Sequence, residues 1–252
     1  MRVEVRKAAG GFDRPAIQEL GAAALVCTVL LAPLPTLASG GAFAVDDVGI
    51  DSVGSCKVES WASFADNRDF IGAVAPGCVV SLGRPVELGM TFARFHSGGE
   101  WGSEMVFKGK TNLIPVEGNK FGLAIIAGGA IDLTSRQFNA AFVTIPVSFQ
   151  LHDQLQLNVN AGWIGNPTTN EHAASWGVGL TWEYNKHFKV IGETFGFVGD
   201  GFNRNPRAQV GLRFTPQEHY DIDIIYGRNI VGENANWITV GLNLRFDASG
   251  FK

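Results

Sequence analysis

Residues 238–246 read ITVGLNLRF, and this stretch decides the fold class. Every second residue from Ile238 to Phe246 is apolar, whereas the residues between them are small, polar or charged. A period of two is the repeat of a β-strand, in which successive side chains point to opposite faces of a sheet. A strand with one wholly apolar face fits either a soluble β-sandwich or a transmembrane β-barrel.

The same alternation recurs along the chain and predicts twelve strands. Most of these runs reach the length of about 9–11 residues that a tilted strand needs to cross a bilayer. The expected strands are 55–64, 74–82, 86–96, 101–111, 119–128, 138–149, 154–163, 174–184, 187–197, 206–214, 219–228 and 236–246.

The predicted connections alternate between short turns and longer polar links. The short turns are 83–85, 152–153, 185–186 and 215–218, and the longer links are 65–73, 97–100, 129–137, 164–173, 198–205 and 229–235. The link at 97–100 is short for its class. This asymmetry is typical of outer-membrane barrels, which have short periplasmic turns and longer outer loops. An even strand number also places both ends of the barrel on the periplasmic side.

Aromatic residues gather at the ends of the predicted strands. Near the short turns they are Phe149, Trp182, Tyr184, Phe188, Phe214, Tyr220 and Phe246; near the longer links they are Phe95, Trp101, Trp163, Trp176, Phe195, Phe197, Tyr226 and Trp237. Two aromatic belts at the two bilayer interfaces would have this distribution. A soluble sandwich would instead concentrate its aromatic side chains at mid-strand. We therefore predict an all-β protein, a twelve-stranded antiparallel transmembrane β-barrel in an up-and-down meander.

The composition agrees with an envelope protein. Charged residues make up 17% of the chain, below the roughly 25% of soluble domains, and the formal net charge is −4. The chain has no Lys- or Arg-rich block, which argues against nucleic acid as a partner. After residue 35 no apolar run approaches the ~20 residues of a membrane helix.

The N-terminus has the three parts of a secretory signal peptide. A basic start is followed by an apolar stretch at 21–34 and then by Ala42-Phe43-Ala44, with small residues at −3 and −1 of a cleavage site before Val45. A cut after Ala38 and an uncleaved anchor helix are the alternatives. The expected division is 1–44 signal peptide, 45–54 periplasmic N-terminal segment or plug, 55–246 transmembrane barrel and 247–252 C-terminal tail.

Two cysteines, Cys56 and Cys78, remain after removal of the leader, which carries Cys27. Their midpoint falls in the predicted turn around Asn67, so a hairpin centred there would place the two thiols opposite each other. Exported chains form disulfides. A Cys56–Cys78 disulfide and two buried free thiols are both open at this point.

Charged residues within the predicted strands nearly all share the face opposite to the apolar one. They are Glu59, Glu104, Lys108, Lys110, Glu183, Glu193, Arg207, Arg213, Asp221, Asp223 and Arg245. A charge on the lipid face costs about 2–4 kcal/mol at the bilayer midplane, so these residues are candidates to line the lumen. They could line a conducting path or form a network that fills a closed barrel.

Pro146 lies in the middle of a predicted strand. Proline has no backbone N–H to donate to the neighbouring strand, so this residue predicts a bulge or local kink.

The C-terminal half resembles a known family in its strand motifs. These motifs are residues 157–163, 177–184, 190–196, 211–216, 221–227 and 240–246. They are similar to the proteobacterial outer-membrane transporters of the "MetA-pathway of phenol degradation" family. The resemblance covers about residues 100–246, and implies a channel-like protein linked to uptake of small aromatic or hydrocarbon compounds. One departure is that Asp247–Lys252 follow Phe246, whereas outer-membrane proteins usually end on an aromatic residue.

Motifs for catalysis or metal binding are weak. The histidines are His96, His152, His172, His187 and His219. His96-Ser97, near Glu100 and Glu104, is the one Ser/His/carboxylate group, but adjacent strand residues point to opposite faces, which separates a nucleophile from its base. The sequence has no CxxC, HExxH, phosphate-binding or dinucleotide-binding motif. We therefore expect no enzyme activity, no metal and no cofactor.

The expected function is passive passage of a small solute through the bacterial outer membrane, with small hydrophobic or aromatic compounds as the solutes that the resemblance implies. The alternative is a structural or accessory barrel with a closed lumen, part of a larger envelope complex; a membrane-embedded hydrolase is a weaker third. The expected partners are outer-membrane lipid, lipopolysaccharide and the solute. A monomer is favoured over a trimer because no long constriction loop or apolar subunit patch is visible.

Overall fold

The computed structural model describes residues 42–116, 120–199, 201–202, 204–232 and 235–247. Most of the predicted signal peptide and of the predicted tail therefore lies outside the described residues. Within the described part of the chain, no helix is long and apolar enough to cross a membrane.

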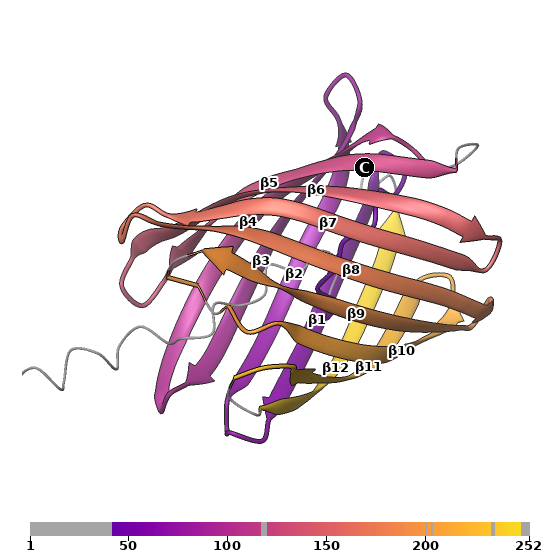
Figure 1. Ribbon diagram of the computed structural model, residues 1–252. Coiled ribbons are helices and arrows are strands. Elements are labelled where there is room, and N and C mark those ends of the chain that lie inside the picture. The colour runs from indigo at the N-terminus through magenta and orange to yellow at the C-terminus, as the bar shows by residue number, and fades with distance from the viewer. Residues whose placement is uncertain (1–41, 117–119, 200, 203, 233–234, 248–252) are drawn as a thin grey trace, which may run out of the picture. The chain divides into compact units, whose positions relative to one another are not determined.

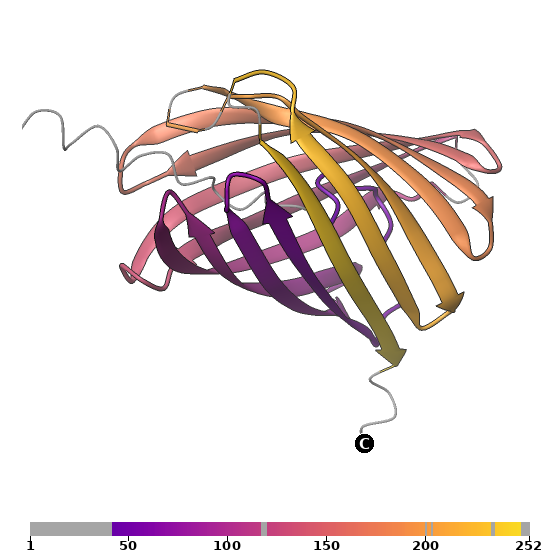
Figure 2. The ribbon, with the colours of Figure 1, turned by 90° about the horizontal axis from the view of Figure 1, so that it is seen from below.

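The described residues form twelve strands that close into one antiparallel barrel (Figures 1 and 2). The strands are β1 (Ser55–Ala65), β2 (Phe70–Ser81), β3 (Pro85–Ser97), β4 (Glu100–Ile114), β5 (Phe121–Asp132), β6 (Gln137–His152), β7 (Leu155–Asn166), β8 (Glu171–Asn185), β9 (Phe188–Gly199), β10 (Arg207–Gln217), β11 (Tyr220–Asn229) and β12 (Asn236–Asp247). Each strand pairs with its neighbours in the chain, and β1 pairs with β12 from Ser55↔Asp247 to Ala65↔Trp237. The predicted twelve-stranded meander is confirmed.

The outer face of the barrel is apolar and the inner face is polar. In β12, Val240 is 48% exposed, whereas its neighbour Thr239 is 2% exposed. A soluble protein would bury the first residue and expose the second. This inversion, repeated around the sheet, leaves a continuous apolar surface that only lipid can cover.

Several links are shorter than the sequence indicated. β3 continues to Ser97 and β4 starts at Glu100, so the link predicted at 97–100 is a tight turn through Gly98 and Gly99. Both glycines have positive φ (58° and 89°), a conformation that favours a residue without a Cβ. Hydrogen bonds between the backbones of neighbouring strands continue beyond the residues whose side chains alternate. The strands are therefore longer than the alternating stretches of sequence.

The bulge predicted at Pro146 is not there. Leu123↔Val147 and Ile126↔Thr144 keep one register on either side of this residue, and the β5–β6 register shifts instead between Ala130 and Ile131. The missing N–H leaves a gap in the ladder without adding a residue to the strand.

The two aromatic belts also need a correction. Phe195 and Phe197 were expected at the interface near the longer links, but they share the inner face of β9 with Glu193. Phe195 is 7% exposed, and Phe197 packs against Phe202 from the β9–β10 link.

Cys56 and Cys78 lie directly opposite each other across the β1–β2 pair and are joined in a disulfide.

The outward orientation of β12 leads to a first prediction. Leu242→Arg, near the middle of the strand on the lipid face, should destabilise the folded barrel by about 2–4 kcal/mol, because the guanidinium would enter hydrocarbon. Phe246→Arg, on the same face at the strand end, should cost about 0–1 kcal/mol. Urea titration of the barrel folded into lipid vesicles measures both, and equal effects would contradict the placement of Leu242.

Candidate functional site

The lumen holds the segment that precedes β1, residues 42–54, which we call the lumen segment. Its backbone N–H groups donate to inner-face side chains of three strands. Val45 donates to Glu193 on β9 (3.1 Å), Asp46 to the Asn160 amide oxygen on β7 (2.6 Å), and Val48 to the Ser148 hydroxyl on β6 (3.1 Å). The Asn160 amide also donates to the Asp46 carbonyl at 2.8 Å. The backbone of Asp46 is therefore bound through both its N–H and its carbonyl group.

Side chains of the lumen segment pack closely on the barrel wall. Phe43, Val45 and Val48 are buried. Two glycines of the wall make this approach possible: a Cβ on Gly177 would lie 2.9 Å from the Val45 side chain, and one on Gly211 would lie 2.8 Å from the Phe43 ring. Wall and segment therefore fit each other at the level of single methyl groups.

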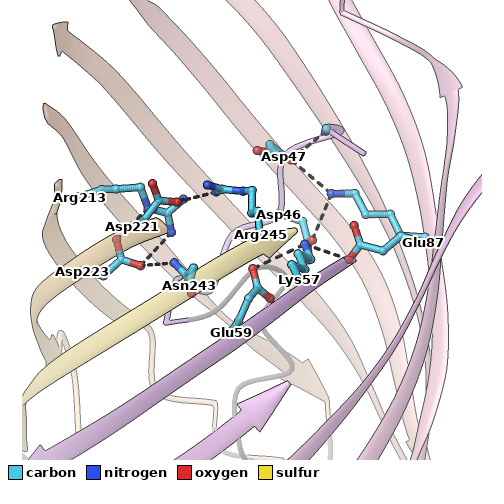
Figure 3. Close-up of polar contacts among 12 residues, drawn as sticks. Asp46, Asp47, Lys57, Glu59, Glu87, Arg213, Asp221, Asp223, Asn243 and Arg245 are labelled. Carbon is cyan, nitrogen blue, oxygen red and sulfur yellow. Dashed lines mark hydrogen bonds and ion pairs between the residues drawn. The ribbon is translucent and has the colours of Figure 1, made fainter. Parts of the chain in front are cut away.

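One cluster of charges connects the lumen segment to β1, β3 and β4 (Figure 3). Lys57 of β1 lies 3.0 Å from Glu87 and 3.5 Å from Glu59, measured from the ammonium nitrogen to a carboxylate oxygen. The Lys110 ammonium of β4 lies 3.2 Å from Asp47 and 3.9 Å from Asp46. We call these residues the β1–β4 cluster.

A second cluster lies on the other side of the closure, on β10, β11 and β12 (Figure 3). The Arg213 guanidinium binds both carboxylate oxygens of Asp223, at 2.8 and 2.9 Å. Arg245 donates to Asp221 at 2.5 Å, and the Asn243 amide donates to Asp223 at 2.9 Å. In this β10–β12 cluster, both carboxylates have cationic and neutral donors, an arrangement that stabilises buried charge.

An apolar cluster occupies one part of the interior. Val106, Ile126, Ala140, Phe142 and Ile164, from β4 to β7, form a buried cluster that Phe202 of the β9–β10 link joins. Next to it lies a cavity of about 60 Å³ bounded by the lumen segment, β6, β7, β8 and β9. Since one water needs about 10–15 Å³, the cavity has room for a few waters.

The structure places most candidate residues on the inner face. Buried there are Glu59, Glu104, Lys110, Glu193, Arg207, Asp221 and Asp223, whereas Lys108, Arg213 and Arg245 are half-buried. Glu183 lies at the end of β8, where its side chain is 45% exposed and pairs with Lys189 at 3.2 Å. Sequence reasoning missed Asp46, Asp47, Lys57 and Glu87. Glu87 lies directly opposite Lys110 in the β3–β4 register, and this cross-strand pairing could have identified it.

Arg207 and Glu104 differ from the two clusters because they have no counter-ion. Arg207 is 7% exposed, and its guanidinium lies 5.9 Å from the centre of the Phe195 ring. Among the described residues, no carboxylate and no hydrogen-bond acceptor contacts that guanidinium. Glu104 accepts a hydrogen bond from Asn139 (2.9 Å), while its second oxygen has no partner among the described residues.

The site defines the class of protein: a closed transmembrane β-barrel with a charged interior. The chain belongs to the family described as "Uncharacterised conserved protein UCP029691", whose model matches residues 26–246. No curated protein shows a match to this sequence.

Solved structures show the same fold. The NanC porin has a TM-score of 0.59 at 8% identity and covers 74% of this chain and 98% of its own. The KdgM porin in complex with disordered oligogalacturonate has a TM-score of 0.58 at 9% identity, over 75% and 99%. The COG4313 outer membrane channel from Pseudomonas putida F1 has a TM-score of 0.56 at 11% identity, over 79% and 98%. At these identities the likeness establishes the fold.

The environment of Asp46 generates a second prediction. Burial raises the pKa of this carboxyl from 3.8 to about 6, and the neighbouring Lys110 ammonium opposes the rise. A raised folded-state pKa means that the contribution of Asp46 to stability is fully present below pH 3.8 and is lost as the pH rises through about 6.

Asp46→Asn should therefore stabilise the barrel above pH 6 and have little effect near pH 4. Urea midpoints measured from pH 4 to 8 test this. Asp153→Asn, in an exposed turn, is the control and should follow the wild-type profile. A stabilisation by Asp46→Asn that is equal at both ends of the range would contradict the prediction.

Proposed function

We propose that this protein is a passive outer-membrane channel for a small solute, and that the lumen segment is its constriction. The observation that carries the proposal is the interior itself: ionised and amide side chains line β1 and β9–β12, next to a segment that crosses the lumen. A protein with a merely structural barrel has no need to keep so many charges inside, because apolar packing fills a barrel at lower desolvation cost.

The solute path that we infer follows the polar wall. On the other side, the apolar cluster of β4 to β7 takes up part of the interior. The proposed path passes the β10–β12 cluster, Arg207 and the lumen segment. Its charges have both signs, which argues against strong selection of solutes of one charge.

Small aromatic or hydrocarbon compounds are the solutes we propose first. The resemblance of the C-terminal motifs to the "MetA-pathway of phenol degradation" transporters supports this choice. Phe195 and Phe197 on the inner face supply aromatic surface beside the proposed path. The same side chains would offer stacking contacts to a flat apolar molecule.

A closed structural barrel is the second candidate, and a specific observation favours it. Both the lumen segment and the apolar cluster occupy space inside the barrel, with a cavity of about 60 Å³ next to them. We further propose a monomer in contact with outer-membrane lipid and lipopolysaccharide.

A hydrolase is disfavoured, because the His96 ring contacts the Arg68 carbonyl at 3.1 Å and packs beside Trp101, away from a nucleophile.

Planar-bilayer recording distinguishes the two candidates. The wild-type barrel should show small discrete currents, and the double variant Ser148→Ala/Asn160→Ala should increase conductance or open time several-fold, since it removes hydrogen bonds that hold the lumen segment. Glu183→Gln, at the rim, is the control and should leave the current unchanged. Absence of current and of solute flux in liposomes for all three proteins would favour the structural barrel.

Arg207 provides a test of the proposed path. Because its charge has no counter-ion among the described residues, Arg207→Met should lower the anion-to-cation permeability ratio while leaving thermal stability equal or higher. Reversal potentials in a salt gradient measure the ratio. Arg84→Met, in an exposed turn, should change neither quantity. An unchanged ratio in Arg207→Met would remove this residue from the path.

A further inference from the structure

Glu193 is a buried carboxylate that lacks a cation. The residue is 6% exposed, and its oxygens accept hydrogen bonds from the backbone N–H of Ala44 (2.9 Å), the backbone N–H of Val45 (3.1 Å) and the Gln209 amide (2.7 Å). Among the described residues, no Lys or Arg forms an ion pair with it. A buried charge held by neutral donors alone is costly, and the acids of the two clusters all have cations.

The nitrogen next to this carboxylate is the one that signal-peptide removal would turn into an amine. The predicted cut hydrolyses the peptide bond between Ala44 and Val45. A signal peptidase adds one water across it, so that Ala44 leaves with a carboxylate and Val45 keeps an α-amino group, which is protonated below its usual pKa of about 7.7–8.0.

We propose that the α-ammonium group of Val45 in the processed chain forms a buried ion pair with Glu193 inside the barrel. This inference rests on the predicted cut after Ala44 and is independent of channel activity. The ammonium has three donors, so it keeps the hydrogen bond that Val45 already makes and supplies another in place of the lost Ala44 N–H.

The position of Val45 does not depend on the residues that are removed. Its side chain lies against Gly177 and Gly179 of β8, where an added Cβ would come within 2.9 and 3.2 Å. Asp46, the next residue, is held by both hydrogen bonds to Asn160. The new N-terminus is therefore fixed from its C-terminal side, and little ordering entropy opposes the ion pair.

Processing also clears part of the lumen. Phe43, which leaves with the signal peptide, packs with Ile191 and Ile225, and its ring centre lies 5.2 Å from the Arg213 guanidinium. Its departure opens space on the wall formed by β9 to β11, beside the β10–β12 cluster. The same cut thus anchors the remaining lumen segment and widens the proposed path.

A double-mutant cycle in free energy tests the ion pair. Two chains are refolded into vesicles, one starting at Val45 and one starting at Ala42, each with and without Glu193→Gln. In the chain starting at Val45, Glu193→Gln should increase the unfolding equilibrium constant by about tenfold or more, as for loss of a buried charge pair. In the chain starting at Ala42, where the Val45 nitrogen is an uncharged amide, the effect should be clearly smaller.

Glu183→Gln is the matched control and should have the same small effect in both chains, since its carboxylate pairs with Lys189 at the rim. The intact mass of the barrel purified from outer membranes should correspond to a chain that begins at Val45. An N-terminus elsewhere, such as after Ala38, or equal effects of Glu193→Gln in the two chains, would overturn the proposal. Neither measurement depends on current, so failure of this proposal and failure of the channel proposal are separable.

Discussion

Closure of the backbone ladder is the constraint on which the rest of this structure depends. In a bilayer an unpaired N–H or C=O group costs several kcal/mol, so a sheet can span it only if it has no edge. Pairing of β1 with β12 over the full length of β1 removes both edges. Once the sheet is closed, strand alternation leaves one face to lipid and the other to the interior, and every inner-face contact follows from that division.

The interior shows how a narrow barrel accommodates buried charge. Arg213, Asp221, Asp223 and Arg245 satisfy one another across three neighbouring strands, while Lys110 reaches the lumen segment through Asp46 and Asp47. These contacts stabilise the closed sheet and line the proposed path at once. The proposed conduction and the stability of the barrel would therefore depend on the same side chains, whereas Arg207, which has no counter-ion among the described residues, is left to interact with a solute on the proposed path.

Strand number and the orientation of most charges could be predicted because both depend on a period of two that is visible locally. Prediction was wrong where local alternation was read without its neighbours. Phe195 and Phe197 were assigned to an interface although they share parity with Glu193. The link at 97–100 was grouped with the longer links, although it is short for that class and its two glycines favour a tight turn. At Pro146 a bulge was one of the two expected outcomes, but the loss of one donor left the register unchanged.

The alternation within each strand was enough to predict a transmembrane barrel, its inner and outer faces and the orientation of most of its strand charges, because each strand carries that information locally. What fills the lumen is visible only in the folded barrel. Val48 meets Ser148 across 100 positions of the chain, and Ala44 meets Glu193 across 149. No periodicity links residues so far apart, because they come together only after the sheet has closed around them.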